Sequence, residues 1–197
     1  MGQPAAKRMT VHDYVALEAA SPDRHEFLAG EVWAMSGGTD AHDALSTAIA
    51  SEFRAALRGG ECSARGSNLR VKSGVTGLYT YADALVVCGP RFEDEKRTTL
   101  LNPRVIVEVL SESTEAYDRG EKFAHYRTME SVADYVLVST TAPLVEVYSR
   151  EGESWMLRVH RGGGSLHVPS IDVRLSIAAL YEGIVLDPPR AHAAIVR

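Results

Sequence analysis

The stretch VIVEVL, residues 105–110, reads as the middle of a buried β-strand that contains one acidic residue. β-branched residues favour strands, and a carboxylate among them is rarely buried unless another group pairs with it. Glu108 therefore either faces water from an edge strand or has a partner elsewhere in the chain. An arginine such as Arg104 or Arg119 is one candidate partner, and a metal ion is another.

A second acid stands before another apolar run, in YADALVVC, residues 81–88. Asp is depleted in strands, yet Asp83 comes directly before the apolar residues. Paired strands lie about 4.8 Å apart, so Asp83 and Glu108 would be neighbours if these two strands were adjacent. Two ionised carboxylates repel at that distance unless a cation neutralises them, and Mg²⁺ prefers such oxygen ligands. The pair predicts a metal site; the alternative for Asp83 is a residue that caps a turn.

The segment STEAYDRGEKFAHYRTM, residues 113–129, is predicted to form a helix soon after the acidic strand ends. Asp118, Lys122 and either His125 or Tyr126 share one face of such a helix. The short link brings its first turns near the acidic strand, where Lys122 would stabilise charge on an attacked phosphate or orient the attacking water. Asp118 and Tyr126 are assigned supporting roles. The alternative for Lys122 is an ordinary exposed lysine.

Two further candidates precede these segments. HEFLAGEVWAM is predicted to form a hairpin with strands around residues 24–28 and 31–35. Glu26 in its first strand either points toward the same site or faces solvent. His42 lies at the start of a helix predicted over residues 40–58, and it either supports the site or is an exposed histidine near the helix cap.

The order of the remaining segments predicts the fold class. A capped helix is expected over residues 10–20, two strands within residues 61–88, and a short closing helix in RLSIAALYEG. Further strands are expected in ADYVLVST, LVEVYSR, SWMLRVHR and SLHVP. The pattern predicts an α/β protein, bordering on α+β, with a mixed β-sheet flanked by helices. A single domain is expected over residues 10–185, with a flexible N-terminus over 1–9 and a C-terminal tail over 186–197.

Charge and composition narrow the functional classes. The net charge is −5, with a sequence pI near 5.8, so the overall field does not attract a polyanion. The one modest basic stretch is SARGSNLRVK, which contains Arg65, Arg70 and Lys72. This composition argues against a high-affinity DNA-binding protein, but it is compatible with a nuclease that acts through a cleft.

The sequence also bears on compartment and cysteine chemistry. It contains neither an apolar run of membrane-spanning length nor a secretory h-region, so cytoplasmic residence without membrane association is expected. Cys62 and Cys88 lie far apart and outside any metal-binding pattern. Neither a disulfide framework nor a zinc site is therefore expected, and Cys88 is expected to pack as a small hydrophobic residue.

Several stretches resemble the Uma-type "putative restriction endonuclease" family, a branch of the PD-(D/E)XK nuclease superfamily. The resemblance runs from about residue 10 to 185 and is most specific over 105–126. The stretches are RHEFLAGEVWAMS, HDALSTAIASEFRAAL, YADALVVC, VIVEVLSESTEAYDRGEKFAHYRTMESVADYVLVS and VEVY.

The resemblance implies a restriction-endonuclease-like core and a nuclease site that depends on Mg²⁺ or Mn²⁺. The matching acids are Glu26, Asp83 and Glu108. Leu110 stands where the superfamily usually has a lysine, and the resemblance assigns that function to Lys122 in the following helix. His42 matches a histidine of the family. Nucleic acid, with DNA as the expected target, is the implied partner, and a homodimer is expected because such nucleases often cut two strands as symmetric pairs.

Two departures from the family pattern concern the surroundings of these acids. Ala82 replaces the proline that usually precedes the aspartate, and Ala29 occupies a turn position where Asp is common. Neither change removes a predicted ligand. Two other functions compete with the nuclease: a binding or scaffold protein that keeps the fold with little activity, and a glycosidase that uses the paired acids as a general acid and base.

Overall fold

The central strand of the fold is β8 (Val105–Leu110), and all six of its residues are buried. The computed structural model describes residues 8–35 and 37–188. The expected flexible N-terminus over 1–9 and the tail over 186–197 therefore fall mostly outside the described residues. Because β8 pairs on both sides, the alternative in which Glu108 faces water from an edge strand is wrong.

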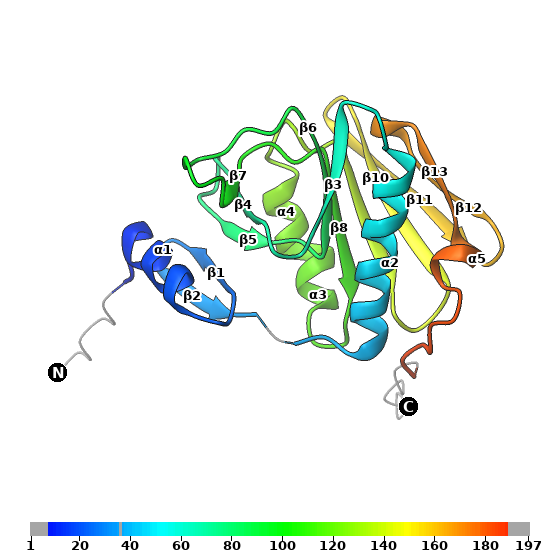
Figure 1. Ribbon diagram of the computed structural model, residues 1–197, viewed down its shortest axis with the longest axis horizontal. Coiled ribbons are helices and arrows are strands. Elements are labelled where there is room, and N and C mark those ends of the chain that lie inside the picture. Colours follow the sequence, from blue (N-terminus) through cyan, green and yellow to red (C-terminus); the bar gives the residue numbers. More distant parts are fainter. Residues whose placement is uncertain (1–7, 36, 189–197) are drawn as a thin grey trace, which may run out of the picture.

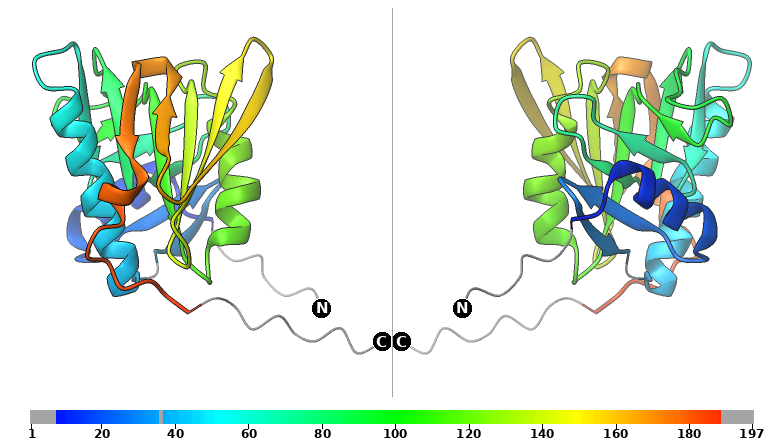
Figure 2. Two further views of the ribbon diagram at one scale, coloured as in Figure 1. Left: turned by 90° about the vertical axis from the view of Figure 1, so that its right-hand side faces the viewer. Right: turned by 90° about the vertical axis from the view of Figure 1, so that its left-hand side faces the viewer.

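β8 belongs to a six-stranded mixed sheet, visible edge-on in Figure 2. It runs antiparallel to one neighbour, β6, and parallel to the other, β9. In spatial order the strands are β11 (Ser154–Arg161), β10 (Leu144–Glu151), β9 (Asp134–Ser139), β8, β6 (Ala84–Cys88) and β3 (Cys62–Gly66). The mixed sheet expected from sequence is confirmed.

A second, five-stranded sheet carries the N-terminal hairpin. Its order is β2 (Glu31–Ala34), β1 (His25–Leu28), β5 (Tyr79–Tyr81), β4 (Arg70–Lys72) and β7 (Thr99–Leu100). Only Ala82 and Asp83 separate β5 from β6, so the chain passes from one sheet to the other at Asp83. The predicted hairpin turn is confirmed: Ala29 and Gly30 have φ angles of 51° and 91°, as a tight hairpin turn requires.

Helices cover both faces of the six-stranded sheet (Figure 2). Because all of its strand pairs except β8–β9 are antiparallel, the fold is α+β rather than α/β. Side chains alternate along β8, so Val105, Val107 and Val109 pack in the core beneath α2 (Asp40–Ala56). The same core includes α5 (Ile177–Leu180) and the hairpin of β12 (Ser165–Val168) and β13 (Val173–Ser176), which a 3₁₀ turn (Pro169–Ile171) connects. Ile106 and Leu110 face the opposite core.

At one end of the molecule, α1 (Val11–Ala20) packs on the N-terminal hairpin (Figure 1). Thr10 and Asp13 form the capping box that the sequence indicates. The rings of Tyr14, Phe27 and Tyr79 make the small core of this region. Within the described residues, no helix combines the length and apolar character that a membrane span needs.

Two predicted helices differ from the structure. The helix expected over residues 113–129 consists of α3 (Glu115–Tyr117), a π-helical segment, η1 (Asp118–Lys122), and α4 (Phe123–Tyr126). The closing segment RLSIAALYEG is helical only over α5, because Val173–Ser176 pairs with β12 instead. The second difference depends on a neighbouring strand that the segment alone does not reveal.

The expectation of unpaired cysteines is wrong. Cys62 and Cys88 lie opposite each other on β3 and β6 and form a disulfide. They are 26 residues apart in sequence, and only the register of two strands brings them together. Disulfides persist mainly in oxidising compartments, so the bond stands in tension with cytoplasmic residence, which stays a prediction.

Reduction of this disulfide is expected to lower the free energy of unfolding by about 3 kcal/mol, because the bond restricts the unfolded chain. Urea unfolding with and without dithiothreitol measures the effect. Cys62→Ser should unfold at one midpoint under both conditions. An unchanged midpoint in the wild type, or two free thiols in the oxidised, unfolded protein, would contradict the assignment.

Candidate active site

The predicted acids and the lysine converge where the two sheets meet. Glu26 comes from β1, Asp83 from the junction of β5 and β6, Glu108 from β8 and Lys122 from η1. β6 and β8 pair with Ala84 opposite Val107, and continuing that register by one residue sets Asp83 opposite Glu108. The predicted adjacency of the two acidic strands is confirmed.

Lys122 is the partner of Glu108. Its Nζ lies 3.0 Å from Glu108 Oε2 and 3.6 Å from Glu26 Oε1. It also lies 3.7 Å from Asp118 Oδ1 and donates a hydrogen bond of 3.1 Å to the carbonyl oxygen of Tyr81. The arginine alternative is wrong for Arg119, which pairs with Glu115 and Glu146 instead.

The π-helical segment accounts for the position of this lysine. A π-helix has a wider turn than an α-helix and occurs often at functional sites. Asp118 and Lys122 begin and end this segment, and both side chains are directed into the acidic cluster. The hydroxyl of Tyr135 donates a hydrogen bond of 2.8 Å to the carbonyl oxygen of Asp118, which anchors the start of the segment to β9.

Burial governs the electrostatics of the cluster. Glu108, Asp118 and Lys122 are 2%, 3% and 4% exposed. Burial raises the pKa of Glu108 well above its usual range despite the attraction of Lys122, and burial likewise raises the pKa of Asp118. Burial alone would lower the pKa of Lys122, but the surrounding carboxylates, Glu108 first, raise it well above its usual range. One ammonium group thus faces three carboxyl groups, a cluster that favours a further cation.

Asp83 has different surroundings. Its Oδ2 accepts a hydrogen bond of 2.7 Å from the backbone N–H of Val109 and lies 3.3 Å from His42 Nε2. Burial alone would raise the pKa of Asp83, but the hydrogen bond and charge of His42 lower it. In turn, burial alone would lower the pKa of His42, and Asp83 raises it. The predicted alternative of an exposed His42 is therefore wrong.

Glu26 points into the cluster rather than into solvent. Its Oε1 accepts a hydrogen bond from the hydroxyl of Thr80, and its Oε2 accepts one of 2.8 Å from Tyr117. Thr80 and Tyr117 were not among the predicted site residues. Tyr117 directly precedes Asp118, but nothing in the local pattern indicates that its hydroxyl reaches a strand 91 residues earlier.

Tyr126 lies behind the cluster. It is buried, and its ring packs against Tyr135 at 5.7 Å between centroids. Burial raises the pKa of Tyr126 well above its usual range, and the charge of Glu108 adds to the effect. The side chain belongs to the core on the α4 face of the sheet, so its contribution is to packing beneath the acids.

A cleft of about 610 Å³ opens over these residues, between the β1–β2 hairpin and the body of the protein. Its lining includes Glu26, His42, Asp83, Glu108, Asp118 and Lys122. The half-exposed ring of Trp33 also lines it. All the predicted site residues except Tyr126 thus border one cleft.

The oxygen donors of the cluster suit a divalent ion. Glu108 Oε1 is buried without a hydrogen-bond partner among the described residues, and an orphaned carboxylate oxygen is costly to bury. Carboxylate oxygens of this kind suit Mg²⁺ or Mn²⁺. Across residues 8–35 and 37–188, no three His, Cys, Asp or Glu side chains already form a metal-binding group. The residues fit an ion held by two carboxylates together with water or substrate oxygens.

The chain is similar to a protein family and to several known proteins. A family model named Uma2 and described as "Putative restriction endonuclease" matches residues 11–179. The "Uncharacterized protein slr1290" of Synechocystis sp. is 33% identical over 179 residues, which cover 90% of this chain and 93% of the relative. The "Uncharacterized protein sll1609" of the same organism is 28% identical over 153 residues, covering 77% and 86%.

A solved structure supports the fold. A crystal structure described as "a putative nuclease belonging to DUF820" from Anabaena variabilis superposes with a TM-score of 0.72 at 18% identity. The match covers 90% of this chain and 99% of the other. At this level of identity the likeness concerns the arrangement of helices and strands.

Proposed function

Because the chain belongs to the Uma2 family, described as "Putative restriction endonuclease", we propose that it is a metal-dependent nuclease that hydrolyses phosphodiester bonds in nucleic acid. One observation carries the proposal above the others: the buried, unpartnered Oε1 of Glu108 in a strand directly opposite Asp83. DNA is the expected substrate. The family match supports a nuclease-like function. The metal ion and the substrate are part of our proposal.

Asp83 and Glu108 would hold a Mg²⁺ or Mn²⁺ ion at the floor of the cleft. Such an ion lowers the pKa of a bound water and neutralises charge on a phosphate oxygen. The side chain of Asp83 is held in one orientation, because its Oδ2 contacts the backbone N–H of Val109 and the ring of His42. Its other carboxylate oxygen, Oδ1, would then bind the ion.

Lys122 would stabilise the negative charge that develops on the phosphate. Its ammonium group is held at the cluster by Glu108, Glu26 and the Tyr81 carbonyl oxygen. A preorganised cation in a buried site stabilises developing charge more strongly than one in water. Glu26 and Asp118 orient the ammonium group, and Tyr117 and Thr80 in turn orient Glu26.

A cleavage assay tests the proposal. Single- and double-stranded oligonucleotides of DNA and RNA are incubated with the full chain in Mg²⁺ or Mn²⁺, with EDTA as the control. Cleavage in either metal that disappears in EDTA is the expected result. Cleavage that persists in EDTA would refute the metal-dependent mechanism and would indicate phosphodiester cleavage by side chains alone, such as paired acids acting as a general acid and base.

The second candidate is a nuclease-fold protein that binds without cutting. It is favoured by the absence of a three-ligand group in the part of the chain that the structure describes, and by the net charge of −5. Calorimetric titration with Mn²⁺ separates the two. The nuclease proposal requires binding heat that disappears in Asp83→Asn and in Glu108→Gln, whereas a scaffold needs no such heat.

His42→Ala is expected to lower metal affinity or cleavage by about 10- to 100-fold, because a hydrogen-bond partner that orients a ligating carboxylate is lost. Mn²⁺ titration and steady-state cleavage measure the two effects. His12→Ala is the matched control, since its side chain is 93% exposed. Equal metal affinity and cleavage in both variants would show that His42 has no such function.

A homodimer would place two such clefts at two strands of a duplex, as symmetric pairs of nucleases do. It is a proposal that rests on the nuclease assignment. Sedimentation of the full chain with and without a duplex oligonucleotide measures it directly.

A further inference from the structure

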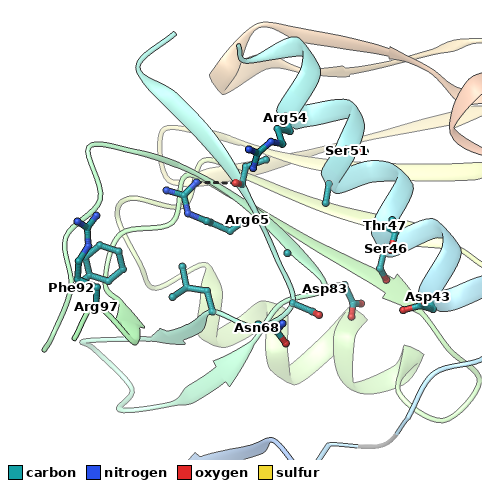
Figure 3. Close-up of a pocket in the computed structure, with 15 residues that line it drawn as sticks. Asp43, Ser46, Thr47, Ser51, Arg54, Arg65, Asn68, Asp83, Phe92 and Arg97 are labelled. Atoms are coloured by element: carbon teal, nitrogen blue, oxygen red, sulfur yellow. Dashed lines mark hydrogen bonds between the residues drawn. The ribbon is translucent and has the colours of Figure 1, made fainter. Parts of the chain in front are cut away.

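A second hollow of about 700 Å³, shown in Figure 3, shares one lining residue, Asp83, with the acidic cleft. We call this hollow the arginine groove and define it by Ser51, Arg54, Arg65, Asn68, Phe92 and Arg97. The two hollows are therefore neighbours, and Asp83 lies at the boundary between them.

One wall of the groove is a stripe along α2. Asp43, the adjacent residues Ser46 and Thr47, the adjacent residues Ala50 and Ser51, and Arg54 recur every three to four residues and so share one helix face. Small side chains along most of this stripe leave room between the helix and β3. Figure 3 shows the stripe running from Asp43, beside Asp83, to Arg54 at the far end.

The opposite side is built by β3 and two loops. Arg65 on β3 donates a hydrogen bond of 2.8 Å to the neighbouring carbonyl oxygen of Ala64, which holds its guanidinium beside the groove. Asn68 follows in the next loop. In the loop before β7, the guanidinium of Arg97 lies 4.7 Å from the ring centroid of Phe92. Three arginines on three separate elements thus border one hollow.

The lining of the groove carries opposite charges at its two ends. The end at Asp43 and Asp83 is acidic, and the far end carries the three arginines (Figure 3). None of these arginines forms an ion pair with a carboxylate among residues 8–35 and 37–188, whereas Arg119 and Arg158 are paired. In a chain of net charge −5, three unpaired arginines in one groove are a local attraction for an anion.

We infer that the arginine groove holds the sugar-phosphate backbone of the nucleic-acid strand that continues beyond the acidic cleft. The inference rests on the proposed nuclease function. Guanidinium groups bind phosphates through paired hydrogen bonds, and hydroxyl and amide groups such as those of Ser51 and Asn68 supplement backbone contacts.

The test compares two double variants that remove the same charge. Arg54→Gln/Arg65→Gln alters the groove. Arg161→Gln/Arg174→Gln alters exposed arginines on β11 and β13, and β11 is the edge of the sheet opposite β3. Fluorescence anisotropy with a labelled single-stranded oligonucleotide of about 16 nucleotides measures binding in EDTA, over a range of salt concentrations. Cleavage of the same oligonucleotide in Mg²⁺ gives kcat and KM.

The groove variant is expected to bind about tenfold more weakly, with the slope of log affinity against log salt reduced by about one to two. Its KM should rise while kcat changes little, because the arginines lie away from the acids. Binding and KM equal to those of the control variant would overturn the inference and leave the nuclease proposal intact. A wild-type chain that binds no oligonucleotide would overturn it as well. Groove-dependent binding without cleavage by any variant would support the groove and refute the catalytic proposal.

Discussion

Glu108→Gln is expected to lower the rate of Mg²⁺-dependent cleavage by at least about 10²–10³-fold, the effect of losing one electrostatic stabiliser in a closed site. The substitution keeps the shape of the side chain and removes the charge that would hold the ion. Single-turnover cleavage of a labelled oligonucleotide measures the rate. Asp83→Asn should have an effect of the same order, since the two acids face each other across β6 and β8.

The control for these variants is Glu153→Gln, which changes an exposed acid in the turn between β10 and β11. It should cleave at the wild-type rate. Equal cleavage by Glu108→Gln, Asp83→Asn and Glu153→Gln would remove the basis of the nuclease assignment, because the acidic cluster would then have no part in the reaction.

Lys122→Met is expected to destabilise the protein by about 3–5 kcal/mol, because it leaves buried carboxylates without their cation. Glu108 and Asp118 are almost fully buried and lie within 4 Å of the lysine Nζ, at 3.0 and 3.7 Å. Urea unfolding measures the free energy. Lys96→Met, at an exposed lysine in the loop before β7, should change it little.

The double variant Glu108→Gln/Lys122→Met separates charge from packing. Removing both partners of a buried ion pair costs less than removing one, so the double variant should be more stable than Lys122→Met alone. If the double variant is no more stable than the single one, the lysine stabilises the fold through packing of its chain rather than through its charge. Cleavage by Lys122→Met must be measured under conditions in which this variant is folded, so that a loss of activity does not reflect unfolding.

Two acids of the candidate site, Asp83 and Glu108, were predictable because each one breaks a local rule. Glu108 interrupts a run of β-branched residues, and Asp83 stands directly before another apolar run. Such a residue is costly in a strand unless a partner compensates it. The pattern also predicted that the helix following β8 returns close to Glu108, because the connection is short.

Other features of the candidate site could not be predicted from the sequence, because they depend on the geometry of the folded chain. The α-helical spacing correctly placed Asp118 and Lys122 together, but it does not reveal the π-helical segment that directs both into the cluster. Tyr117 and Thr80 reach Glu26 from elements far apart in the chain. The alternatives for Glu26 and His42 remained open in the sequence, because an alternating strand or a helix start has two faces and only their neighbours decide which one is buried.

By itself, the sequence indicated an apolar strand that contains an acid, the mixed sheet flanked by helices, and Asp83, Glu108 and Lys122 as the leading candidates for the site. These features depend on residue order within short segments, where periodicity and cost of burial act locally. Only the tertiary structure decided which residues face one another: the pairing of Cys62 with Cys88, the position of Glu26, and the arginine groove that begins at Asp83. The register between distant strands sets these contacts, and it depends on the packing of the whole chain.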